Sequence, residues 1–311
     1  MFKRIIAMIA ALPILLLCGC GKVQKESEKL QIVTTIFPAY DFARQIFGDK
    51  ADVTLLLKPG TESHSYDPSA KDIVKIEDCD LFIYNGGESD AWVDNILKTT
   101  NDVNAVRMMS FVEALEEEDL EGAEDHEEHD HDEEYDEHIW TSPKNAALIV
   151  DGIKQEAVKV DEKNKDFYEQ NAADYSVKIN DLNKRFKELL AGESRYFVFG
   201  DRFPLLYFFK EYGLNYYAAF PGCGAETEPS AQTIAFLTEK LNEGNTLPVV
   251  FYIELSNHKL ADTLAAENKL STAEFHTCHN ITVDDFSAGE SYVTLMERNY
   301  QTLENILKKG A

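Results

Sequence analysis

Basic residues are scarce in this chain. Its 311 residues include 30 lysines and arginines against 56 aspartates and glutamates, which gives a formal net charge of −26. A chain this acidic repels nucleic-acid phosphates, so we expect no nucleic-acid binding. Between residues 113 and 137 there are 16 acidic residues and no lysine or arginine. Much of the excess negative charge is therefore local, and the rest of the chain is only moderately acidic.

The N-terminal apolar run, Ile5 to Leu17, is too short to cross a bilayer as a permanent helix. It follows the basic pair Lys3-Arg4, as in a signal peptide. Leu17-Cys18-Gly19-Cys20 resembles a bacterial lipobox, and Cys20 suits lipidation better than Cys18 because the small Gly19 precedes it. We therefore predict a signal peptide over residues 1–20, a tether over 21–29, and an extracytoplasmic protein anchored to the cell membrane through lipid on Cys20.

Catalytic signatures are absent as well. The sequence has no HExxH segment, no CxxC pair and no nucleophile motif. An exported zinc hydrolase would need three protein ligands, an open position for water and a general base, for which Asp201 or Glu226 could be offered. An adhesion module is a further alternative, but the sequence has no internal repeat that would suggest one. We therefore expect a binding protein and not an enzyme.

Cysteine is sparse beyond the N-terminal segment, where only Cys79, Cys223 and Cys278 remain. Three cysteines allow at most one internal bridge, and export permits disulfides. Cys223 and Cys278 both fall in predicted loops of the C-terminal half, so we favour them as the pair. Cys79 leads into an apolar segment and is predicted to be a buried thiol.

Strand and helix patterns alternate in both halves of the chain, which indicates parallel sheets flanked by helices. Predicted strands cover 30–37, 52–57, 81–84, 103–108, 196–199, 216–220 and 249–253. Predicted helices cover 40–47, 69–77, 92–98, 145–160, 162–190, 204–211, 230–243, 259–267 and 291–309. Ligands in such sheets lie beyond the carboxyl ends of the strands, and His64 follows the second strand in a place of that kind.

The segment 162–190 has apolar residues at helical spacing and predicts one helix of nearly thirty residues, about 40 Å long. Such a helix would be a stiff connector. We predict an N-terminal α/β lobe over 30–142, linking helices over 143–192, and a C-terminal α/β lobe over 193–311.

The most informative stretch is His126 to Pro143, HEEHDHDEEYDEHIWTSP. Its first three histidines, His126, His129 and His131, lie in the acidic segment 113–137, which we expect to be disordered because like charges repel and cannot form a core. Imidazole and carboxylate are ligands for divalent transition metals. We interpret these three histidines as an accessory loop that gathers metal, and His138, where apolar residues resume, as part of a fixed site.

Taken together, these segments resemble the metal-binding lipoproteins of ABC importers for zinc and manganese, the cluster A-I solute-binding proteins. The likeness covers nearly the whole mature chain. It is carried by IVTTIFPAYDFARQIFGDK, TLLLKPGTESHSYDPSAKDI, CDLFIYNGG, EHIWTSPKNA, AETEPSAQ and SYVTLMERN. The family takes one ligand from a P-G-x-x-x-H-x-[FY]-[ED]-P loop and one from an H-[IV]-W segment. His64 and His138 match these positions, and a histidine-rich loop before the second ligand is typical of zinc-specific members.

The ligands of the second lobe are less clear from the resemblance. Arg202 stands where the family has a third ligand, and a guanidinium has no lone pair to offer a metal. Asp201 is the neighbour that could bind, or Arg202 could hold a carboxylate ligand in place. The fourth position aligns with His276, with His279 as the alternative. The expected set is thus His64, His138 and His276, completed by Asp201 or His279.

The resemblance implies an extracytoplasmic protein that captures zinc and delivers it to the membrane permease of an ABC importer. Manganese is the alternative cargo, although imidazole-rich coordination disfavours it. We expect a monomer with small tilts of its lobes on binding. Trp140 is expected to pack the wall of the site. Glu254 and Glu226 are candidate hydrogen-bond partners of the histidine ligands.

Overall fold

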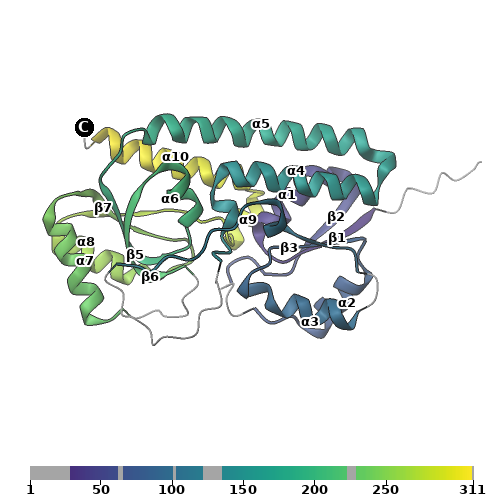
Figure 1. Ribbon diagram of the computed structural model, residues 1–311, viewed down its shortest axis with the longest axis horizontal. Helices are drawn as coiled ribbons and strands as arrows, with labels where there is room; N and C mark the ends of the chain where they lie inside the picture. The colour runs from purple at the N-terminus through teal and green to yellow at the C-terminus, as the bar shows by residue number, and fades with distance from the viewer. Residues whose placement is uncertain (1–28, 62–65, 101–102, 122–134, 223–228, 310–311) are drawn as a thin grey trace, which may run out of the picture.

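The computed structural model describes residues 29–61, 66–100, 103–121, 135–222 and 229–309. It contains two four-stranded parallel sheets, one in each half of the chain, with helices packed against them (Figure 1). The expected α/β class is therefore confirmed. Among the described residues, no helix is long and apolar enough to span a membrane.

The first sheet has the order β2-β1-β3-β4, and all its strand pairs are parallel. Its strands are β1 (Leu30–Thr34), β2 (Ala51–Leu55), β3 (Leu81–Tyr84) and β4 (Ala105–Arg107). The helices between them are α1 (Phe37–Phe47), α2 (Ala70–Asp78) and α3 (Ala91–Thr99). Helix α1 begins earlier than expected, because Pro38 lies in its first turn, where a proline costs no hydrogen bond.

The second sheet repeats this order as β6-β5-β7-β8, again with parallel pairs. Its strands are β5 (Tyr196–Phe203), β6 (Asn215–Pro221), β7 (Thr246–Tyr252) and β8 (Ser271–Glu274). Its helices are α6 (Leu206–Tyr212), α7 (Ala231–Glu243), α8 (Lys259–Asn268) and α9 (Val283–Ala288). Gly200 lets α8 approach β5, since a Cβ on it would lie 2.6 Å from Cα of Ala261.

Three long helices join the halves. Helix α4 (Pro143–Val160) is followed by α5 (Lys165–Leu190) and, at the end of the chain, by α10 (Tyr292–Lys309). Figure 1 shows α5 extending along both sheets, with α10 beside part of it. The 26 residues of α5 confirm the expected long connecting helix. One continuous hydrophobic core includes Phe42 of α1, Phe186 of α5 and Phe208 of α6, so the two halves share their interior.

A buried carboxylate also ties the halves together. Asp41 of α1 is 0% exposed and accepts hydrogen bonds from the hydroxyl of Tyr175 in α5 and from the backbone N–H of Tyr292 at the start of α10, the latter at 2.9 Å. Arg44 donates to Asp41 through Nε at 2.7 Å and also to the carbonyl of Gly289 at 3.0 Å. These contacts join the first lobe, the connecting helix and the last helix at one point.

Candidate metal-binding site

Two imidazole rings meet between the lobes. The ring centroids of His138 and His279 lie 5.4 Å apart, and that of Trp140 lies 5.0 Å from His279. Both histidines are buried, at 0% and 7% exposure. Trp140 donates from Nε1 to the carbonyl of Thr277 at 2.9 Å, so it packs the wall of the site as expected. His138 lies between β4 and α4 in the first half of the chain, whereas His279 belongs to the loop after β8.

Asp136 orients His138. Its Oδ1 accepts from the backbone N–H of His138 at 2.7 Å and lies 3.2 Å from the ring nitrogen Nδ1. A proton on Nδ1 suits this contact, and in that tautomer Nε2 is the ring nitrogen that carries the lone pair. Asn85, at the end of β3, donates to the carbonyl of Glu137 at 2.8 Å and so fixes the same segment to the first sheet.

A small, open cleft lies beside His279. His138 lies behind one lining residue, because its Cε1 is 3.4 Å from the place where a Cβ on Gly222 would stand. The cleft lies at the carboxyl ends of the strands of the second sheet, where parallel sheets bind ligands. Its lining residues are Thr61, Arg202, Pro204, Gly222, Ile253, Glu254, Leu255, Thr277, His279 and Asn280.

Asp201 uses its carboxylate to hold the backbone. Its Oδ1 accepts from the N–H of Arg202 at 2.8 Å, and its Oδ2 accepts from the N–H of Ile253 at 3.2 Å. Burial raises the pKa of Asp201 above its usual value, although hydrogen bonds from Ser256 and from the backbone oppose the rise. The side chain of Asp201 therefore stabilises the ends of β5 and β7, whereas Arg202 lines the cleft.

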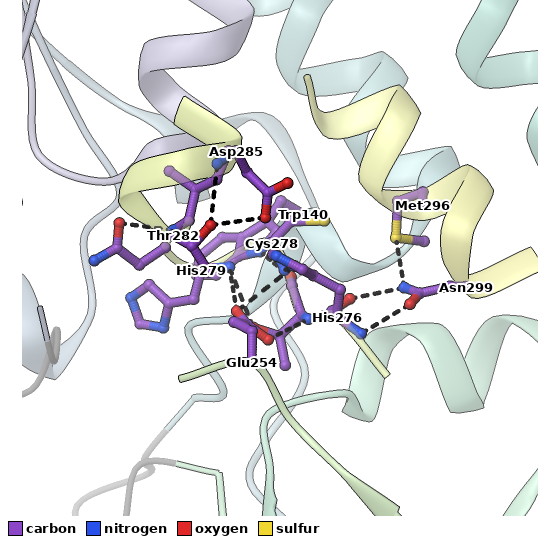
Figure 2. A network of polar contacts seen from close by, with 12 residues as sticks. Trp140, Glu254, His276, Cys278, His279, Thr282, Asp285, Met296 and Asn299 are labelled. Atoms are coloured by element: carbon purple, nitrogen blue, oxygen red, sulfur yellow. Dashed lines mark hydrogen bonds and ion pairs between the residues drawn. The ribbon is translucent and has the colours of Figure 1, made fainter. Parts of the chain in front are cut away.

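His276 and His279 face different surroundings, although they share one turn. Figure 2 shows their rings pointing in different directions. His276 is buried, and its Nδ1 accepts from the backbone N–H of Cys278 at 2.9 Å. His279 lines the cleft, and His276 does not. The expected hydrogen-bond partner Glu254 contacts this turn through backbone groups, accepting from the N–H of Thr277 at 2.7 Å and of His279 at 3.2 Å.

Cys278 corrects one expectation. It has a free thiol that is 0% exposed and packs in the main hydrophobic core. Burial raises the pKa of this thiol well above its usual value. The predicted bridge to Cys223 is therefore wrong for this structure, because Cys278 carries a free thiol within the hydrophobic core. Cys79 has a free thiol as well, but it is only partly buried.

Several expected site residues lie outside the described residues: His64, the accessory histidines His126, His129 and His131, and also Cys20, Cys223 and Glu226. Within the part of the chain that the structure describes, no three or more His, Cys, Asp or Glu side chains form a group that could hold a metal. The described residues thus supply two adjacent imidazoles. Asp136 was missed because nothing in the sequence distinguishes it from the other acidic residues of 113–137.

Two α/β lobes with a shared helical framework, and a pair of imidazoles at a cleft between them, define a two-lobed solute-binding protein of the rigid, helix-linked kind. The family model described as "Zinc-uptake complex component A periplasmic", or ZnuA, matches residues 32–306. The chain belongs to the ZnuA family.

Individual relatives agree with this assignment. The chain is 33% identical over 319 residues to the high-affinity zinc uptake system protein ZnuA of Bacillus subtilis, covering 99% of each. It is 34% identical over 307 residues to the zinc-binding lipoprotein AdcA of Streptococcus pneumoniae, covering 97% of this chain but only 60% of AdcA. The crystal structure of the Zn(II)-bound ZnuA-like domain of that AdcA superposes with a TM-score of 0.75 at 31% identity, covering 90% of this chain and 99% of that domain.

Proposed function

We propose that this protein captures zinc outside the cytoplasm and delivers it to the permease of an ABC importer. The observation that carries the proposal is the adjacent, buried pair His138 and His279 at the cleft between the lobes. The family model describes a zinc-uptake component, and relatives that match nearly the full chain are named for zinc binding or uptake. A component of this kind binds its cargo and releases it unchanged, so no catalytic step is required.

The proposed ligands are His138 and His279, with His64 as a third from the loop after β2. His64 lies outside the described residues, and its inclusion rests on the motif around it. Three neutral imidazoles and one oxygen ligand would complete a tetrahedral zinc site. The same donor set disfavours manganese, which prefers oxygen. Asp136 supports His138 in the way that carboxylates commonly support metal-binding histidines.

The shared core and the buried Asp41 contacts favour a site that closes by small movements. Wide separation of the lobes would break interior packing that spans both of them. We therefore propose that metal binding orders the loops around the cleft while the sheets and long helices keep their arrangement.

A competitive titration of the purified protein with zinc and manganese, against a fluorescent chelator, tests this function. We expect tight zinc binding that is lost in His138→Ala and in His279→Ala. His258→Ala is the matched control, because His258 is half exposed and pairs with Asp262 at 2.9 Å on the surface. Tight manganese binding with weak zinc binding, or zinc affinity unchanged in both site variants, would refute the proposal.

A further inference from the structure

We propose that His276 is not a metal ligand but a positioning residue, which holds the turn that presents His279 to the cleft. This inference rests on the proposed function, because it assumes that His279 binds the metal. It assigns different tasks to the two histidines of His276-Thr277-Cys278-His279. One imidazole is used inside the protein as a hydrogen-bond acceptor, and the other is directed to the cargo.

The turn has an unusual backbone. Cys278 has φ = 64°, in the left-handed region that residues other than glycine seldom adopt. Leu255, directly after Glu254, has φ = 61°. Such conformations persist only where the surroundings hold them, and they are common at ligand sites. Here they flank one carboxylate, that of Glu254.

Glu254 holds one side of this turn. Its carboxylate is buried and accepts from the N–H of Thr277 at 2.7 Å, from the hydroxyl of Thr277 at 2.5 Å, and from the N–H of His279 at 3.2 Å. The hydroxyl oxygen of Thr277 accepts from the N–H of His279 as well, at 3.1 Å. These bonds fix the backbone immediately before the imidazole of His279 (Figure 2).

His276 holds the other side. Its Nδ1 accepts from the N–H of Cys278 at 2.9 Å, which satisfies the amide of the strained residue. Asn299 of α10 fixes the backbone of His276, accepting from its N–H at 2.8 Å and donating to its carbonyl at 2.7 Å. The strained turn is thus anchored to the last helix through His276 and to the end of β7 through Glu254.

The same bond excludes His276 from metal coordination in this conformation. A neutral imidazole that accepts a hydrogen bond at Nδ1 carries its proton on Nε2, so neither nitrogen has a lone pair left for a metal. Nε2 of His276 is buried and has no hydrogen-bond partner within the described structure.

Substitution of His276 by asparagine or by leucine distinguishes a positioning residue from a metal ligand. The side-chain oxygen of asparagine, like Nδ1, is bonded to Cγ, so His276→Asn can still accept from Cys278 N–H. His276→Leu keeps an apolar side chain but removes the acceptor. We expect His276→Asn to bind zinc close to the wild-type affinity. We expect the zinc affinity of His276→Leu to fall about 10- to 100-fold, as is typical when a residue that supports a metal ligand is replaced.

Cobalt(II) absorption provides a readout that does not change when a variant is merely less stable. The visible bands of bound cobalt depend on the number and type of its ligands. We expect wild-type bands in His276→Asn and, at saturating cobalt, in His276→Leu. Equal loss of zinc affinity in both variants with altered cobalt bands would identify His276 as a ligand and overturn the inference, as would wild-type affinity in His276→Leu.

A second pair of variants keeps the test decisive if His276→Leu does not fold. Thr277→Ser retains the hydroxyl that joins Glu254 to His279, whereas Thr277→Val removes it. We expect zinc affinity to fall only in Thr277→Val, with circular dichroism confirming the fold, and equal affinities in these two variants would overturn the inference. Failure of the proposed function would be distinct, because His279→Ala would then bind zinc as well as the wild type does.

Discussion

Replacement of Asp41 by alanine tests whether one buried carboxylate stabilises the contact between the lobes. The change leaves the hydroxyl of Tyr175 and the N–H of Tyr292 without their acceptor in a buried place. Each buried donor without a partner costs about 1–3 kcal/mol. Arg44 contributes less, because its side chain is 27% exposed and can turn toward water. We expect Asp41→Ala to lower the free energy of unfolding by about 3–5 kcal/mol.

Urea denaturation followed by circular dichroism measures this loss. With a denaturant slope of roughly 3 kcal/mol per molar, the midpoint should fall by about 1 M or more. Asp49→Ala is the matched control, because Asp49 is the same residue type near the end of α1, with a side chain that is 76% exposed beside Lys50. The control should change the free energy by less than about 0.5 kcal/mol. If Asp41→Ala lowered the free energy of unfolding no more than this control, the carboxylate would not stabilise the contact between the lobes.

Two further predictions concern pH and the membrane. Burial raises the pKa of Asp90 from its ordinary value of 3.8 to about 6, against hydrogen bonds from Gly86, Asn85 and Thr35 that lower it. The folded state therefore binds the proton more tightly, and Asp90 destabilises the fold as pH rises from about 4 through 6. In Asp90→Asn, stability relative to the wild type should be about 2 kcal/mol more favourable at pH 7 than at pH 4, from 1.36 kcal/mol per pKa unit, and a pH-independent difference in urea melts would refute this. For the N-terminus, we propose that Cys20 carries the lipid anchor, so Cys20→Ser should release the protein from membranes in fractionation while Cys18→Ser does not, and retention of both would refute it.

Most elements of the fold could be predicted because their sequences have strong periodicity or local signals. The apolar, β-branched segments became the central strands, and the helical spacing of 162–190 became a short 3-10 turn and α5. Strand β8 and helix α9 were not predicted. β8 has the sequence STAE, and pairing with β7 at the edge of the sheet, not its own composition, makes it a strand. α9 has only six residues, too few for a periodic pattern.

The sequence by itself determined the α/β class, the long connecting helix and the family, and it singled out His138 through the segment that follows it. Which histidine of the HTCH turn faces the cleft was decided only by tertiary structure. Local spacing allows either one, because His276 and His279 have the same side chain and lie on the same loop. The choice depends on the left-handed backbone of Cys278 and on bonds from Glu254 and Asn299. These partners are distant in sequence and come together only when the sheet and the last helix pack.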